Sequence, residues 1–164
     1  MTRCIVAAAL ALACVVPAAA QDRLARFEGG IGVIPTGSTN TTVRGVAAAG
    51  QMWVIDRLSA DIRVDGRISV DGRGLLFGAG NNVGFTGGVS VIATLLCQTS
   101  PTTFSEHSTD PNNGVLLEPN GDFRIEQMLT TVPAECANPV LLIRNAQANA
   151  AGVRGWFAAG IPKL

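Results

Sequence analysis

The chain has 164 residues, of which 48% are hydrophobic and 15% are charged, and its 12 basic and 12 acidic side chains give a formal net charge of +0. Loss of the first twenty residues would remove one arginine and leave a slight acidic excess. A chain without excess positive charge has no electrostatic footprint for nucleic acid or an anionic membrane, so we expect neither partner. Residues 21–164 suit a single domain with one core.

The first twenty residues have the layout of a secretory signal peptide. Arg3 precedes an apolar run from Cys4 to Val16, and three alanines then form a small-residue cleavage site. The apolar run is too short to span a bilayer comfortably, and no later segment reaches eighteen apolar residues, so we expect no transmembrane segment. The sequence therefore predicts cleavage near Ala20 and Gln21 and a secreted or periplasmic protein.

An alternative interpretation makes the protein a lipoprotein anchored at Cys14. Lipidation sites usually have a large aliphatic residue where this chain has Ala11. Cleavage without lipidation is therefore favoured. Arginine dominates the basic residues and tyrosine is absent, which points to a GC-rich bacterial gene and hence to a bacterial envelope or secreted protein.

Two glycine-rich stretches resemble nucleotide-binding motifs. GVIPTGST (32–39) fits the phosphate-loop pattern except at Ser38, where the lysine should be, and a β-branched, turn-rich segment follows it instead of a helix. GAGNNVG (78–84) is one residue too long for the dinucleotide fingerprint. We therefore expect no cofactor, and we interpret residues 29–34 as a strand closed by a turn at residues 35–37.

The segment LSADIRVDGRISV (58–70) alternates apolar and polar residues, which is typical of two half-buried strands joined by a turn. The length of the turn decides which residues face each other. A two-residue loop would pair apolar with polar residues. A three-residue loop at 64–66, with Gly66 in the left-handed region, places Ile62 opposite Ile68, and we predict this hairpin.

Further segments have strand composition and are separated by glycine, asparagine or proline, and none has a convincing helical stripe. They are residues 26–35, 42–46, 52–58, 87–97, 115–118, 123–129, 139–145 and 153–160. In the segment 87–97 apolar residues point to both sides, so we expect it to be covered on both faces. The sequence predicts an all-β fold, an antiparallel β-sandwich (Ig-like or similar) of about 8–9 strands.

Only two cysteines follow the signal segment, Cys97 and Cys136. In an oxidising compartment such a pair forms a disulfide. If consecutive strands run up and down, the strand that ends at Cys97 and the strand that ends near Leu129 finish at the same end of the fold, close to Cys136. The bond would close a loop of about 40 residues and stabilise the fold by roughly 4 kcal/mol.

The connection from Gln98 to Gly114 is long for a compact domain and rich in polar residues, and such loops tend to be functional. By the same up-and-down count it lies at the disulfide end, near the hairpin tip at 64–66 and the loop at 130–138. We therefore expect a recognition surface for a protein or glycan there. Its candidate residues are Glu106, His107, Asp110, Asn112 and Asn113.

His107 is the single histidine of the chain. Ser105, Ser108 and the carboxylates Glu106 and Asp110 lie close in sequence, but a nucleophile, base and orienting group need rigid geometry that one polar loop rarely supplies. We interpret His107 as an exposed loop residue and predict no catalytic residues. One histidine and two paired cysteines leave no zinc site, so we predict no metal site.

Several of these features together resemble a group of small secreted bacterial β-rich proteins with one cysteine pair, a hypothetical-protein group of uncharacterised function. The features are RFEGGIGVIP (26–35), DGRISVDGRGLL (65–76), the pair Cys97 and Cys136, and an ending of the form PVLLIR…WFAAG (139–160). The resemblance covers nearly the whole mature chain. It implies no activity, cofactor or catalytic residue.

The sequence favours a non-enzymatic secreted or envelope β-domain with a binding or structural role. One alternative is a hydrolase that uses the His107 loop. Another is a small-ligand carrier, which would need an apolar cavity. Trp53 is interpreted as a core residue and not as a sugar-binding platform, because no aromatic cluster surrounds it.

Overall fold

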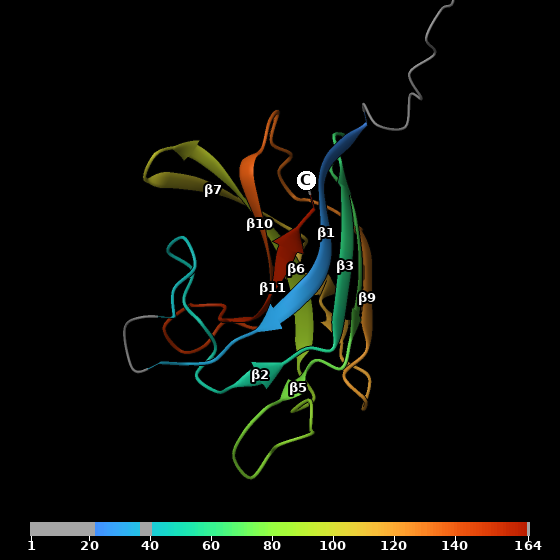
Figure 1. Ribbon diagram of the computed structural model, residues 1–164, viewed down its shortest axis with the longest axis vertical. Helices are drawn as coiled ribbons and strands as arrows, with labels where there is room; N and C mark the ends of the chain where they lie inside the picture. Colours follow the sequence, from blue (N-terminus) through green and yellow to red (C-terminus); the bar gives the residue numbers. More distant parts are fainter. Residues whose placement is uncertain (1–21, 37–40, 164) are drawn as a thin grey trace, which may run out of the picture.

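The computed structural model describes residues 22–36 and 41–163 (Figure 1). The expected cleavage site at Ala20 and the alternative anchor Cys14 lie outside these residues. The described part contains one short 3-10 helix, η2 (Pro111–Asn113), and none of its helices could cross a membrane. Its strands are β1 (Arg23–Gly32), β2 (Trp53–Val54), β3 (Arg57–Arg63), β4 (Arg67–Arg73), β5 (Leu76–Phe77), β6 (Ser90–Ser100), β7 (Thr103–Ser108), β8 (Val115–Leu116), β9 (Phe123–Met128), β10 (Ala137–Asn145) and β11 (Trp156–Pro162).

Nine of these strands form one antiparallel sheet in the order β7-β6-β10-β11-β1-β3-β4-β9, with β8 paired to β6, and β2 and β5 form a separate two-stranded sheet. The sheet is curled into a half-barrel (Figure 1). A bridge between Thr109 and Leu129 links the ends of β7 and β9, the two outermost strands of this order. The all-β, antiparallel prediction is confirmed. The predicted sandwich of two stacked sheets is not confirmed. Strands β1 and β11 pair with each other, and this joins the strands β7-β6-β10-β11 and the strands β1-β3-β4-β9 into one sheet.

The concave side of the sheet holds the core. Strands β3 and β4 bury every second residue, as the alternation in the sequence requires. Burial of one large aliphatic side chain contributes about 1.5–3 kcal/mol to the stability. Its fully buried side chains include Phe27, Leu58, Ile62, Ile68, Val70, Leu95, Ile125, Leu141 and Ile143.

The predicted hairpin between β3 and β4 is confirmed. Ile62 pairs with Ile68 and Ala60 pairs with Val70. Gly66 has a φ of 87°, the left-handed conformation that a three-residue loop requires of its last residue. The alternation of apolar and polar residues was enough to select the loop length. A shift of the pairing by one residue would place apolar side chains opposite polar ones on the same face of the sheet.

Strand β6 is buried on both faces from Val91 to Cys97, as predicted. Part of the cover comes from residues 41–49, in which Val46 belongs to the core. The expectation of a strand over 42–46 is wrong. Val43 and Val46 pair with each other across a two-residue turn, and Arg44 and Gly45 have φ values of 51° and 88°, the signature of a type I′ turn.

The expectation of a long loop from Gln98 to Gly114 is also wrong. Strand β6 continues to Ser100 and β7 returns along it, so Glu106 and His107 lie in a strand. Hydroxyl groups pair across the two strands, with 2.8 Å between Thr94 Oγ1 and Ser108 Oγ. An outermost strand with polar residues on both faces lacks the apolar alternation that identifies a strand in a sequence.

The predicted disulfide between Cys97 and Cys136 is confirmed, with Cα atoms 4.7 Å apart. Cys97 lies in β6, and Cys136 directly precedes the neighbouring strand β10, where Ala137 pairs with Gln98. The bond therefore ties the start of β10 to the base of the hairpin formed by β6 and β7.

Candidate functional site

The β6–β7 hairpin lies at one margin of the sheet, at the upper left of Figure 1. Successive side chains of a strand point to opposite faces, so β7 divides its polar residues between two environments. Ser105 and His107 lie on the side of the core, whereas Phe104 and Glu106 lie on the outer side. The candidate residues thus fall into separate groups.

On the core side, His107 is half-buried and both of its ring nitrogens have partners. Its Nδ1 lies 3.1 Å from the carbonyl oxygen of Thr131, and its Nε2 lies 2.9 Å from Ser105 Oγ. With the proton on Nδ1, the ring donates to the Thr131 carbonyl and accepts from the Ser105 hydroxyl. The prediction of an exposed loop histidine is therefore wrong, because His107 connects β7 to the segment that follows β9.

The structure brings together three segments that the up-and-down count placed at one end. The N–H of Leu129 donates to the carbonyl of Gly66 at the hairpin tip, at 2.9 Å. The N–H of Thr130 donates to the carbonyl of Ser108 at the end of β7, at 2.8 Å. The tip at 64–66, the loop after β9 and β7 are therefore neighbours.

Asp110, Asn112 and Asn113 lie elsewhere, at the opposite end of β6. The Oδ1 of Asp110 accepts from the backbone N–H of Asn112, and its Oδ2 accepts from the side-chain amide of Asn113. Asp110 is thus the N-cap of η2. These polar groups hydrogen-bond to one another and form a turn. Their position at the start of β6 separates them from Glu106 and His107.

Glu106 belongs to the outer side of the hairpin. Its Oε2 lies 2.7 Å from Nη1 of Arg144, whose side chain is only 12% exposed. Arg144 is itself held by a hydrogen bond from Nε to the carbonyl of Arg154, at 3.0 Å. Glu106 therefore points away from His107, and the partners of Nδ1 are the carbonyl and hydroxyl oxygens of Thr131 and not a carboxylate.

Arg44 also lies on this outer side and was not identified from the sequence. Its guanidinium lies 4.6 Å from the centre of the Phe104 ring, and its Nη1 donates to the carbonyls of Leu96 (3.2 Å) and Asn138. Burial lowers the pKa of Arg44, but a guanidinium remains charged at neutral pH. The clue in the sequence was an Arg-Gly pair between two valines, which is also the pattern of an ordinary turn.

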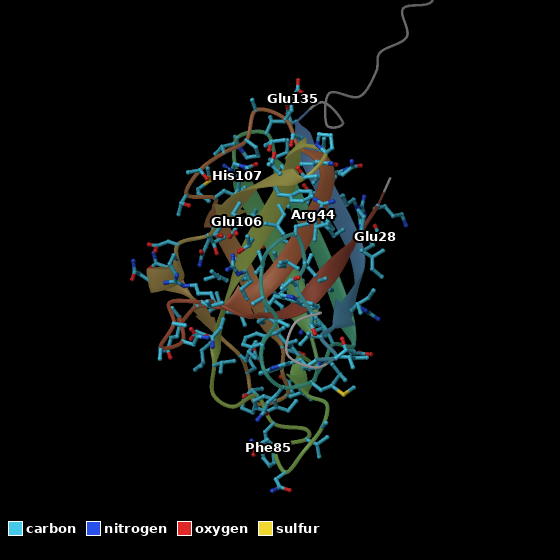
Figure 2. All side chains as sticks on the ribbon, turned by 90° about the vertical axis from the view of Figure 1, so that its left-hand side faces the viewer. Glu28, Arg44, Phe85, Glu106, His107 and Glu135 are labelled. Carbon is cyan, nitrogen blue, oxygen red and sulfur yellow. A yellow bond between two sulfur atoms is a disulfide. The ribbon has the colours of Figure 1, made fainter. Side chains whose placement is uncertain are left out.

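Two strained residues meet at this point. Arg44 and Asn138, with φ values of 51° and 43°, are the two non-glycine residues with positive φ in residues 22–36 and 41–163, and they are hydrogen-bonded to each other. Such conformations are costly and concentrate at functional sites. We call the surface formed by Arg44, Gln98, Phe104, Glu106 and Asn138 the hairpin face. Figure 2 looks onto it, with Arg44 and Glu106 labelled.

A hollow of about 390 Å³ lies elsewhere, between residues 47–50 and the loop that joins β10 to β11. Its walls are alanine, glycine and amide side chains together with Val153 and Phe157. The Oδ1 atoms of Asn145 and Asn149 accept hydrogen bonds from backbone N–H groups of their own loop. The hollow is therefore lined by both polar and apolar groups.

Comparison of the chain with protein-family models, curated proteins and solved structures finds no match. Within the described ranges, no group of three or more His, Cys, Asp or Glu side chains could hold a metal ion.

Proposed function

We propose that this protein is a non-enzymatic secreted or bacterial envelope β-domain that binds a ligand through the hairpin face. Secretion is supported by the layout of the first twenty residues and by the resemblance to small secreted proteins. The binding role is supported by one observation above all, the convergence of Arg44 and Asn138 in costly left-handed conformations at a single surface point.

The construction of the hairpin face fits this role. The disulfide braces β6 against β10 beside it, and Arg44 fixes the neighbouring turn on the same strands. Side chains held on rigid strands lose little entropy when a ligand binds, and this favours affinity. A purely structural role would not need a cation, an aromatic ring and two amide groups held together at the surface.

We expect Phe104→Ala to abolish or strongly weaken binding to whichever ligand the wild type retains. The immobilised mature domain would be tested against arrays of bacterial glycans and against envelope proteins of its own host. The matched control is Arg63→Ala, because Arg63 is an exposed residue at the end of β3. Equal retention by wild type and Phe104→Ala would contradict the assignment of the hairpin face, and no retained ligand at all would contradict a binding function.

A hydrolase is the second candidate, because the Ser105 hydroxyl, the His107 ring and the Thr131 carbonyl form a chain of nucleophile, base and orienting group. If this serine is activated, a fluorophosphonate probe should label it. Intact-mass measurement would then show one adduct on the wild type and none on Ser105→Ala. An unlabelled wild type under conditions that label a known serine hydrolase would rule this candidate out.

A further inference from the structure

The guanidinium of Arg44 is only partly used. Its hydrogen bonds both come from Nη1, which reaches the carbonyls of Leu96 and Asn138. Within the described part of the chain, Nε and Nη2 have no hydrogen-bond or ion-pair partner. These two nitrogens form the fork of parallel N–H groups with which arginine binds a carboxylate at two points.

The positive charge of Arg44 is held in place but is not neutralised. Backbone carbonyls and the face of Phe104 orient the guanidinium without supplying a negative charge. The acidic side chain of the hairpin face, Glu106, is ion-paired with Arg144 at 2.7 Å. Because Arg144 neutralises Glu106, the positive charge of Arg44 remains available on the hairpin face to attract an anion.

Two amide groups complete the hairpin face. Asn138 Nδ2 lies 2.6 Å from Gln98 Oε1, and this bond orients both side chains. The bond leaves Asn138 Oδ1 as an acceptor and Gln98 Nε2 as a donor, which are the neutral polar groups that bind sugar hydroxyls. Phe104 is only half-buried, so one aromatic residue adjoins the amides and the cation.

From this arrangement we propose that the hairpin face binds a carboxylate-bearing saccharide, with the carboxylate on the Arg44 fork and the hydroxyls on Gln98 and Asn138. The proposal rests on the binding role of the hairpin face given above. An acidic peptide would offer the same carboxylate. The observations favour a sugar because the fixed neighbours of Arg44 are amides suited to hydroxyl groups, whereas a protein interface would need a larger apolar centre.

The test is calorimetric titration of the mature domain with an oligogalacturonate, its fully methyl-esterified form and an oligoglutamate of matched charge. We expect binding of the free acid only. Arg44→Lys keeps the charge but lacks the fork and should weaken binding about tenfold, and Gln98→Ala should also weaken it. Arg63→Ala should bind as the wild type does, and the thermal midpoint of each variant would establish that it is folded.

Each other outcome overturns the proposal in a distinct way. Equal binding of the methyl ester would show that the hairpin face does not recognise the carboxylate. Equal binding of oligoglutamate would show that it does not recognise the saccharide. Failure of the free acid to bind would overturn the proposal as a whole. A ligand found on the arrays that depends on Phe104 would still uphold the binding function, so the two claims fail separately. If Arg44→Lys does not fold, Gln98→Ala carries the test.

Discussion

Removal of the Cys97–Cys136 bond is expected to lower the free energy of unfolding by about 4 kcal/mol. The two cysteines are 39 positions apart, and the bond restricts the unfolded chain by closing that loop. The bond joins the neighbouring strands β6 and β10, and the loop that it closes contains β7, η2, β8 and β9. A domain with a total stability of about 5–15 kcal/mol would lose a large part of it.

Equilibrium denaturation in urea, with and without a reducing agent, would measure this loss. The matched control is the double variant Cys97→Ala, Cys136→Ala, which should be less stable than the oxidised wild type and equally stable with and without the reducing agent. Reductant should therefore affect the wild type alone. A wild type whose midpoint is unchanged after verified reduction would show that the bond adds little to folding.

Replacement of Trp53 by alanine is expected to cost about 3–5 kcal/mol, the range for a large aromatic residue removed from a core. Trp53 is 2% exposed, and its ring centre lies 4.2 Å from those of Phe77 and Phe157. The indole thus fastens the small β2–β5 pair against β11. Burial confirms the prediction that Trp53 is a core residue, whereas the expectation that no aromatic cluster surrounds it is wrong.

Trp53→Phe is the matched control, because it keeps an aromatic ring in the same place and should cost much less than Trp53→Ala. Urea denaturation followed by circular dichroism would compare the two variants without relying on tryptophan fluorescence. A loss below about 1 kcal/mol for Trp53→Ala would mean that the surrounding residues close the space it leaves. The contacts of Trp53 with Phe77 and Phe157 would then contribute far less to stability than the burial of Trp53 indicates.

Local chemistry predicted those elements that depend on neighbours in the sequence. The loop of the β3–β4 hairpin followed from parity, because only one loop length places Ile62 opposite Ile68. The pairing of Cys97 with Cys136 followed from the count of cysteines and from the oxidising compartment that was expected from the sequence. Few loop lengths and only one cysteine pairing were possible. Neither prediction therefore required knowledge of a long-range contact.

The parts that could not be predicted depend on contacts between distant segments. Strand β7 is polar on both faces and is a strand because it hydrogen-bonds along β6, which its own residues do not reveal. Residues 42–46 form a turn because the outer side of the sheet offers the carbonyls of Leu96 and Asn138 to Arg44. Neither segment has the regular apolar alternation that identifies a strand in a sequence.

The sequence by itself determined the all-β class, the register of one hairpin and the disulfide. The alternation of apolar residues and the turn residues are local signals, and two cysteines allow only one pairing. Only the tertiary structure decided that the strands form one curled sheet, that His107 lies between Ser105 and Thr131, and that Arg44 meets Phe104 and Asn138. Those contacts join residues up to 94 positions apart. They exist because packing of the core face brings the strands together, and no local propensity encodes that order.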